Sequence, residues 1–411
     1  MTTELEFAFR RDWPLIVGAV VRYTGDLQLA EDSVQEAFVR ALASDADGTA
    51  VDNPSAWITT VARRIAIDTI RKGQTLSRAL PALATEALRS NEAVMPDASF
   101  AFTGDERLEL ILMVCHPDLA EEARVALALR FVCGVSTRDI AVVFLVSEST
   151  MAARLTRAKK RIRDSSVRFE FDDVAEVEAR VPDALTTLYL LYTVGHAAPE
   201  ESPLSTAEFR RDAITLARDV VRLVPGDAEA SGLLALLLLT EARQGERFDA
   251  DGELRSLEQA DRSRWDRQAI AEGVELATRS LPGRGRFALQ SGIAGVHALA
   301  PTWAATDWTS VSRLYDRLVE VWPSPSAVLS RIVARGYSDD VGPEVALIEL
   351  EALGGTFGPP LAGQVAAVRG DLQRRLGETG PAIASYRQAI DLESNDRVRR
   401  FLQRRVVELG G

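Results

Sequence analysis

The chain has 411 residues, of which 46% are hydrophobic and 26% charged, a composition typical of soluble globular proteins with two to four domains. Its formal net charge of −12 argues against a protein that coats nucleic acid over its whole surface. It shows no secretory leader and no apolar run of spanning length, so we expect a cytoplasmic protein with no membrane partner. Two cysteines without CxxC spacing and only three histidines predict no disulfide framework, no metal site and no cofactor.

Residues 1–73 predict a small helical domain. Apolar residues recur at helical spacing from Phe9 to Val20, and after a break Asp26 is placed to cap a second helix. The second helix keeps four polar side chains off its apolar stripe: Asp32, Gln35, Glu36 and Arg40. A third helix begins near Pro54 and ends in a basic segment with the polar residues Arg63, Arg64, Asp68, Arg71 and Lys72.

Residues 74–104 lose this periodicity and contain two prolines, so we expect a linker with one short helix around residues 80–88. The periodicity returns in residues 105–166, which predict a helix-turn-helix. Ser136 can cap a first helix with Asp139 in a capping box, and Leu145–Ser147 is short enough for a tight turn. Ser147 then suits the N-cap of a second helix.

The second helix of this motif is amphipathic and basic. Met151, Leu155, Ala158 and Ile162 share one face, which we expect to be buried. From Ser147 to Arg163, six basic residues stand against one acidic residue, in a chain that is acidic as a whole. A DNA recognition helix needs small polar residues at its start and cations further along, although a solvated basic helix would carry the same charges.

Together these segments resemble an extracytoplasmic-function sigma factor, the minimal type of bacterial transcription initiation factor. LAEDSVQEAFVRAL resembles region 2.2 of that family, and PSAWITTVARRIAIDTIRK resembles regions 2.3 and 2.4. The segment from Cys115 to Arg163 resembles region 4. The resemblance covers residues 5–165 and implies an all-α protein that reads promoter DNA through two helical modules.

The resemblance also implies a role for each polar face. The face with Asp32, Gln35, Glu36 and Arg40 would dock on core RNA polymerase. The chemistry of these side chains alone would instead favour a solvated helix face. Residues of the third helix would meet the promoter −10 element: Arg63, Arg64, Asp68, Arg71 and Lys72. Asp68 either accepts from a cytosine amino group or pairs with Arg64 or Arg71. The −35 element would be contacted by Ser147, Thr150, Ala152, Ala153, Arg154, Thr156, Arg157, Lys160 and Arg161, of which Lys160 and Arg161 would bind phosphate.

Residues 167–411 have a different character, with 37 acidic residues against 28 arginines and no lysine. We therefore expect no second DNA-binding domain here. The segment Gly363–Asn395 fits the tetratricopeptide spacing of small and aromatic residues through Gly370, Gly377, Ala382, Tyr386 and Ala389. Residues 213–243 predict the end of one helical hairpin and the start of the next, and residues 307–324 with 341–353 predict a degenerate repeat. We expect a tetratricopeptide-like helical solenoid, and the whole chain resembles the sigma-factor subgroup with such an extension.

Two segments of this extension have open interpretations. A dense polar cluster lies between Asp249 and Arg267; it is either an ion-pair network that holds helices and a loop together or a contact surface for region 4, polymerase or a regulator. The interleaved arginines argue against a metal there. The run Tyr192–His196 stands where relatives in the subgroup carry an Asn-Glu-Gly-Tyr-like run, so no role is transferred to it.

We predict a non-enzymatic sigma factor with four parts: region 2 in residues 1–73, a linker in 74–104, region 4 in 105–166 and a regulatory extension in 167–411. It would bind core RNA polymerase and promoter DNA, and a regulatory protein or ligand would act at the extension. A one-component regulator with a ligand-sensing extension is one alternative, against which the region 2 segments argue. An enzyme is another, but the extension contains no phosphate-binding loop, nucleophile elbow or His–carboxylate metal motif.

Overall fold

The computed structural model describes residues 12–13, 15–21, 23–46, 53–79, 105–164, 171, 173–197, 203–249 and 252–411. Within these ranges the chain is helical and forms no strand; one antiparallel bridge joins Phe248 to Leu254. This confirms the predicted all-α class. The chain divides into two compact units, Met1–Ala198 with Leu204–Leu223, and Pro199–Pro203 with Val224–Gly411.

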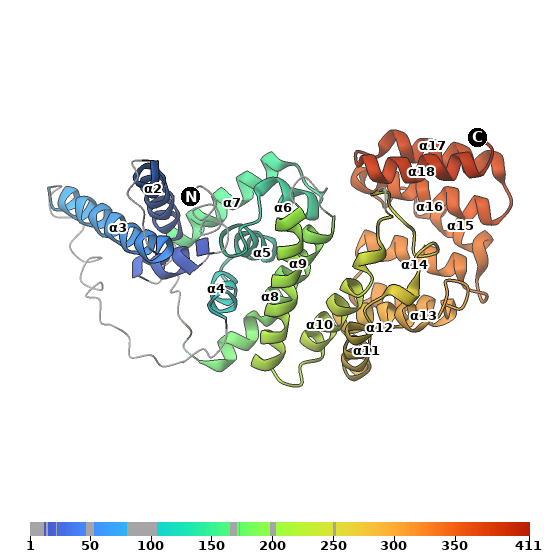
Figure 1. The fold of residues 1–411 in the computed structure, drawn as a ribbon, viewed down its shortest axis with the longest axis horizontal. Helices are drawn as coiled ribbons and strands as arrows, with labels where there is room; N and C mark the ends of the chain where they lie inside the picture. Colours follow the sequence, from blue (N-terminus) through green and yellow to red (C-terminus); the bar gives the residue numbers. More distant parts are fainter. Residues whose placement is uncertain are drawn as a thin grey trace. The chain divides into compact units, whose positions relative to one another are not determined.

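The first unit begins with the helices of the predicted region 2 (Figure 1). Helical residues 12–13 and 15–21 precede α2 (Leu27–Ala46) and α3 (Pro54–Ala79), which pack on each other. The Asp26 side chain accepts hydrogen bonds from the backbone N–H groups of Gln28 and Leu29, at 2.9 and 3.1 Å, so the predicted cap is confirmed. Helix α3 runs six residues past the start of the segment predicted as a linker, and residues 80–104 lie outside the described ranges.

The predicted region 4 follows in the same unit. It consists of α4 (Glu106–Val114), α5 (Glu121–Leu127), a π-helical turn η1 (Ala128–Val132), α6 (Thr137–Val143) and α7 (Glu148–Asp164). Two further helices complete the unit, α8 (Val174–Ala197) and α9 (Pro203–Leu223). Helix α8 packs against α4, α5, α6 and η1. The first helices of the predicted extension are therefore part of the compact unit that holds the sigma-like segments.

The second unit is a series of helices joined by short connections. They are α10 (Ala228–Glu241), α11 (Arg267–Ser280), α12 (Arg286–Leu299), α13 (Trp308–Val321), α14 (Pro325–Tyr337), α15 (Gly342–Ala352), α16 (Ala362–Arg375), α17 (Thr379–Leu392) and α18 (Asp396–Glu408). Single 3-10 turns lie between them at Gln244–Glu246, Arg262–Arg264, Leu281–Gly283 and Pro359–Leu361. Helix α12 packs most extensively on α10, and each helix from α13 onward packs mainly on its neighbours in sequence. Helix α13 packs on α14, and α14 in turn packs on α15, so the two predicted repeat segments share α14 as their partner.

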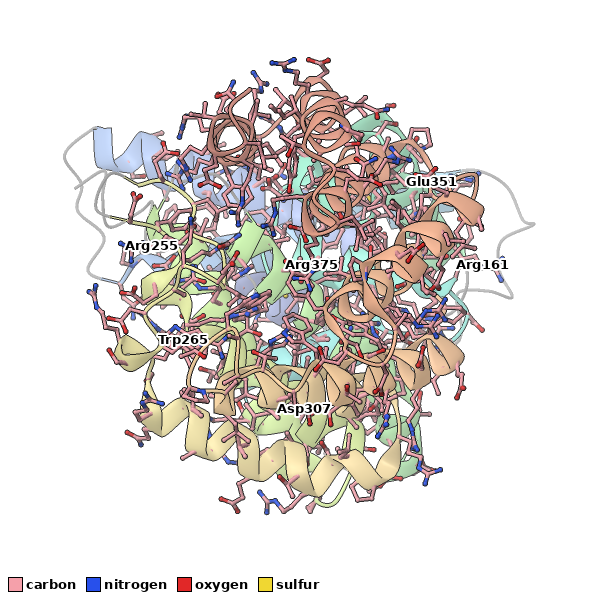
Figure 2. All side chains as sticks on the ribbon, turned by 90° about the vertical axis from the view of Figure 1, so that its right-hand side faces the viewer. Arg161, Arg255, Trp265, Asp307, Glu351 and Arg375 are labelled. Atoms are coloured by element: carbon pink, nitrogen blue, oxygen red, sulfur yellow. The ribbon has the colours of Figure 1, made fainter. Side chains whose placement is uncertain are left out.

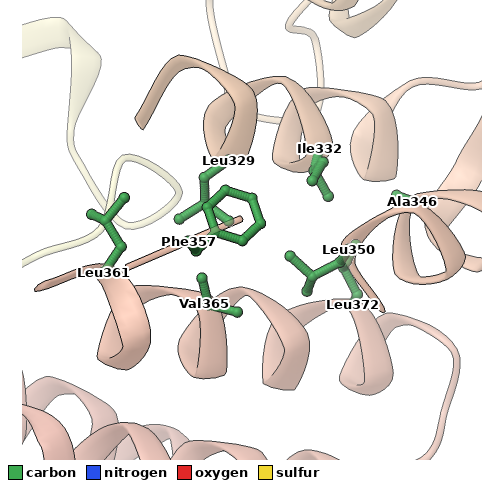
Figure 3. Packing of buried hydrophobic residues seen from close by; sticks show 8 residues of the cluster. All are labelled: Leu329, Ile332, Ala346, Leu350, Phe357, Leu361, Val365 and Leu372. Carbon is green, nitrogen blue, oxygen red and sulfur yellow. The ribbon is translucent and has the colours of Figure 1, made fainter. Parts of the chain in front are cut away.

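Apolar clusters between consecutive helices hold the second unit together. One cluster joins α14, α15 and α16 through Leu329, Ile332, Leu350 and Leu372, with Phe357 from the preceding loop (Figure 3). Such buried side chains each contribute roughly 1.5–3 kcal/mol when they leave water. The unit therefore has a core of its own, as a separate domain requires.

The tetratricopeptide-like spacing has a clear packing reason at the α16–α17 pair. A Cβ atom at Gly370 would lie 2.9–3.1 Å from the ring of Tyr386, so only glycine lets the two helices approach this closely. Gly377 begins the connection between them with φ of +78°, a conformation that favours glycine. Ala382 and Ala389 are fully buried on the same side of α17 as Tyr386. The hairpin is thus as expected, while a regular solenoid stays a prediction.

Candidate nucleic-acid and protein interfaces

The helix-turn-helix is built as its sequence predicts. The Ser136 hydroxyl accepts from the backbone N–H of Asp139 at 3.1 Å, and Ser147 accepts from that of Thr150 at 3.2 Å, so both predicted N-caps are confirmed. In the turn, Val146 N–H donates to Ala141 O and Leu145 N–H to Val142 O, the paired bonds of a Schellman motif. Leu145 takes the left-handed position with φ of 55°, where glycine is the usual residue.

The two faces of α7 differ as the amphipathic pattern predicts. Met151, Leu155, Ala158 and Ile162 are at most 5% exposed and attach α7 to the rest of region 4. Arg154 is partly buried, and the other predicted −35 residues are exposed: Ser147, Thr150, Ala152, Ala153, Thr156, Arg157, Lys160 and Arg161. The nine residues therefore share one accessible surface, which starts at the helix N-terminus and ends in cations.

The cations of α7 divide into two groups. Arg154, Arg157 and Lys160 form no ion pair with any described residue; Arg154 lies 5.7 Å over the Phe144 ring. Lys159 instead points into the protein, where its Nζ is 2.7 Å from a Glu31 carboxylate oxygen and 4.7 Å from the Phe131 ring centre. Uncompensated positive charge on the exposed face is what a phosphate backbone requires.

The basic segment of α3 is exposed along its length. Arg63, Arg64, Asp68, Arg71 and Lys72 are all accessible, on the side of the helix opposite the buried Ala62 and Ala66. Asp68 forms no ion pair among the described residues, so the pair with Arg64 or Arg71 that we held as one alternative is not present. The carboxylate is left open to an external donor.

The polar face of α2 is also accessible. Asp32, Gln35, Glu36 and Arg40 are exposed, and their contacts stay on the helix: Arg40 pairs with Glu36 at 3.0 Å, and Gln28 donates to Asp32 at 2.8 Å. Exposed Val39 and Leu42 lie beside them on the surface of α2. A charged face with apolar neighbours suits a protein partner better than water alone.

Two buried charged side chains connect α8 to region 4, and sequence reasoning missed both. Arg180 is 2% exposed and its Nη1 donates to the carbonyl oxygens of Leu112 and Met113, at 3.2 and 3.3 Å, where α4 ends. Asp183 is 7% exposed and accepts from Arg124 Nη1 at 2.6 Å. The available signal was an Arg and an Asp three residues apart, directly before the mainly apolar second half of the helix, since such residues are rarely buried without partners.

The same interface buries Cys115. Burial raises the pKa of its thiol, with the Asp183 carboxylate adding to the effect, so the sulfur stays protonated.

Gly195, in the run Tyr192–His196, lies where α8 meets α9: a Cβ there would be 2.5 Å from Thr206 O, and Arg210 donates to its carbonyl at 2.9 Å. This run therefore has a packing role.

The polar cluster of the extension is an ion-pair network within the second unit. Glu253 binds two arginines of α18, Arg400 at 2.5 Å and Arg404 at 2.6 Å. Hydrogen bonds from these arginines lower the pKa of the Glu253 carboxyl, and the bond from Arg404 has the largest effect. Asp261 and Asp266 cap the turn and helix that follow them. The described residues hold no group of side chains suited to a metal, and Asp251 lies outside them.

An aromatic cluster lies elsewhere in the second unit. Trp308 stacks on Tyr337 with ring centres 4.6 Å apart, and Trp303 meets both rings edge-on. Beside it is a cavity of about 230 Å³ lined by Trp303, Val333, Tyr337, Ala367, Val368, Asp371 and Leu372. Burial raises the pKa of the Tyr337 hydroxyl, which donates to Asp371 at 2.9 Å. Sequence reasoning did not anticipate this cavity because its walls come from two separate helices, α14 and α16, and a loop.

The surface of the second unit mixes charges of both signs. Figure 2, in which this unit faces the viewer, shows nitrogen and oxygen atoms interspersed over it, with Asp307, Glu351 and Arg375 labelled on its helices. Such mixing differs from the single-sign face of α7. No described helix is long and apolar enough to cross a membrane.

Family comparisons agree with the geometry of the first unit. Residues 8–75 match sigma-70 region 2, and residues 109–162 match sigma-70 region 4. Residues 180–281 match a family of unknown function, DUF6596. That match begins at Arg180, the buried arginine of α8, and runs through α11.

Three similar proteins extend the comparison. An uncharacterized protein, R00370, of Rhizobium meliloti is 35% identical over 387 residues, which cover 93% of this chain and 90% of that protein. A probable ECF RNA polymerase sigma factor, SigI, of Mycobacterium tuberculosis is 26% identical over 39% of this chain and 54% of its own length. The ECF RNA polymerase sigma factor SigJ of the same species is 29% identical over 36% of this chain and 46% of its own length.

Proposed function

The chain belongs to the extracytoplasmic-function sigma factors, in a subgroup with a C-terminal helical extension, and from this premise we propose how it acts. It binds core RNA polymerase through α2, meets the −10 element through α3 and reads the −35 element through α7. The extension regulates these steps. The protein itself is not an enzyme, because polymerase supplies the catalysis, and it works in the cytoplasm.

The observation that carries this proposal is the exposed face of α7. Small side chains occupy the first turn of α7. Arg154 and Arg157 follow them and have no carboxylate partner among the described residues. Arg154 and Arg157 are placed to reach base edges, while Lys160 and Arg161 stand further along for phosphate. A regulator bound to an operator would use the same helix, but it would not need the second exposed basic face on α3.

Reconstituted transcription tests polymerase binding. Glu36→Lys and Asp32→Lys in the full chain should abolish co-purification with core polymerase and promoter-directed transcription. Because both side chains are exposed, the melting temperature should not change. Glu178→Lys, at an exposed acid of α8 outside all three proposed surfaces, is the matched control. Normal polymerase binding by both α2 variants would contradict the α2 assignment.

Regulation by the extension is supported by the way α8 enters the first unit. A helix whose Leu185, Leu188 and Leu191 are at most 2% exposed cannot leave region 4 without uncovering a core. Any partner or ligand that shifts the second unit can act on region 4 through this continuous connection. The effect on transcription has one of two directions. In support, the extension holds the two sigma modules competent for polymerase; in occlusion, it blocks them until a partner binds.

Truncation separates these cases, and Leu223 is the boundary to use, since the first compact unit ends there. A fragment of residues 1–223 that loses promoter-directed transcription indicates support by the second unit, and one that gains it indicates occlusion. Unchanged transcription by a folded fragment would contradict regulation by the second unit.

A further inference from the structure

Helix α8 reaches the recognition helix α7 through one loop of region 4. Three consecutive carbonyl oxygens of that loop, at residues 117–119, accept hydrogen bonds from two arginines. Arg124 on α5 donates from Nε to Leu119 O at 2.8 Å and from Nη2 to Pro117 O at 3.0 Å. Arg161, near the end of α7, donates from Nε to Asp118 O at 3.1 Å. The loop is therefore tied to both helices.

Asp183 of α8 completes this arrangement from the other side. Its carboxylate takes the remaining Nη1 of Arg124 at 2.6 Å, so all three nitrogens of the guanidinium are held. The side chains of Asp183 and Arg124 are only 10% and 22% exposed, so water screens the pair weakly. A planar guanidinium bound at every nitrogen has one orientation, and Asp183 sets it.

We infer that Asp183 and Arg124 are positioning residues for promoter binding, which act through the loop at 117–119 to orient Arg161 toward DNA phosphate. Arg161 is exposed on the DNA-facing side of α7, and an arginine held at Nε has fewer rotamers to lose when it binds. This inference rests on the proposed function and deepens it, because it names a route by which the extension's first helix supports the −35 reader.

The test uses the full chain with core polymerase and promoter DNA over a range of salt concentrations. Asp183→Asn should weaken promoter binding about threefold to tenfold and flatten the salt dependence by about one phosphate contact. Asp183→Glu keeps the carboxylate and should retain most of the affinity. In an Arg161→Ala background the Asp183→Asn change should add little, because the contact that it positions is already gone.

Thr187→Val provides the matched structural control. Thr187 is fully buried on α8, and its hydroxyl donates to the backbone carbonyl of Asp183 at 2.9 Å, not to the carboxylate that binds Arg124. This variant should lower the melting temperature and leave the salt dependence unchanged. If Asp183→Asn weakened binding equally with and without Arg161, its role would be structural alone and the inference would be wrong.

Hydrogen exchange on the protein without DNA or polymerase provides an independent readout. Asp183→Asn should speed amide exchange in the 117–119 loop and in the last turn of α7. An unchanged last turn would overturn the inference whether or not the protein initiates transcription. Faster exchange in a protein whose polymerase complex binds no promoter would support the positioning and refute the proposed function.

Discussion

Helix α7 and the second unit are both rich in arginine, but they use it in opposite ways. On α7, Arg154 and Arg157 have no carboxylate partner among the described residues. In the second unit, Arg331 and Arg335 of α14 share Glu349 of α15, at 2.5 and 2.7 Å. An arginine whose charge is neutralised internally holds helices together, while an uncompensated arginine on an exposed face is available to an anion. The partners of an arginine, more than its presence, distinguish a DNA surface from a structural one.

The prediction with the largest expected effect concerns His297. Arginines of the second unit act on this histidine, which belongs to the same unit. Burial lowers the pKa of His297 to about 4, and the nearby Arg243 and Arg262 add to the effect. The folded protein then binds this proton only near pH 4, whereas the unfolded chain binds it from about pH 6.5. Stability should therefore fall by about 3 kcal/mol as the pH drops through that window.

Thermal melts of the full chain and of His297→Gln from neutral to acid pH check this expectation. The variant should lose less stability than the wild type across the window. The difference isolates His297 from His116, whose pKa burial also lowers. Parallel pH profiles for the two proteins would show that the pKa of His297 is not lowered in the folded protein.

Glu349 tests the structural use of arginine. Its side chain is 16% exposed, and Glu349→Ala would leave the partly buried Arg331 and Arg335 with Asp316 as their remaining counter-charge, at 4.0 and 2.6 Å. We expect a loss of about 2 kcal/mol, between the values for exposed and fully buried pairs, with unchanged promoter binding. Glu351→Ala on the same helix is the control: its pair with Arg369 is 54% exposed on the acid side and should matter little. An equal loss in both variants, measured by thermal melting, would contradict the role of burial.

The contrast also explains what could be predicted from the sequence. Caps such as Asp26, Ser136 and Ser147, the buried stripe of α7 and the Gly370–Tyr386 contact depend on spacings within one or two helices, and all of them are present. The exposed faces of α2, α3 and α7 follow from the same periodicity. Local pattern therefore determined the candidate surfaces.

Contacts between distant segments were not predictable in this way. Arg124 meets Asp183 across 59 residues, and Glu253 meets Arg404 across 151. Nothing in the local pattern distinguishes these side chains from solvated ones, because tertiary packing chooses their partners. For the same reason the sequence placed a boundary at residue 166, whereas α8 and α9 cluster with the first unit.

Arg157 tests the functional use of arginine. Arg157→Ala should cost about 1–3 kcal/mol in promoter affinity, if the side chain reads a base edge, with no change in melting temperature. Arg317→Ala on α13, also exposed and without a carboxylate partner among the described residues, is the matched control. Promoter binding measured with the polymerase complex should respond only to Arg157. An equal response to both would remove the distinction between the two regions.

The smallest expected effect concerns the edge of the DNA surface. The described non-glycine residues with positive φ are Leu145, in the turn before α7, and Arg284 in the second unit, both at 55°. A side chain in this conformation costs roughly 1–2 kcal/mol, which a substitution by glycine would relieve. The greater conformational freedom of glycine in the unfolded chain offsets part of this stabilisation. Leu145→Gly and Arg284→Gly should thus each stabilise the protein by about 0.5–1 kcal/mol.

Promoter affinity then separates the two sites. Leu145 is 50% exposed and stands two residues before Ser147, where the predicted −35 surface begins. We expect both glycine variants to bind promoter as tightly as the wild type, since the turn geometry is kept or relaxed and no proposed contact is removed. If Leu145→Gly gained stability but lost affinity, the leucine side chain itself would contact DNA or polymerase. The surface of region 4 would then extend from α7 into the turn, and the strained backbone would be explained by that contact.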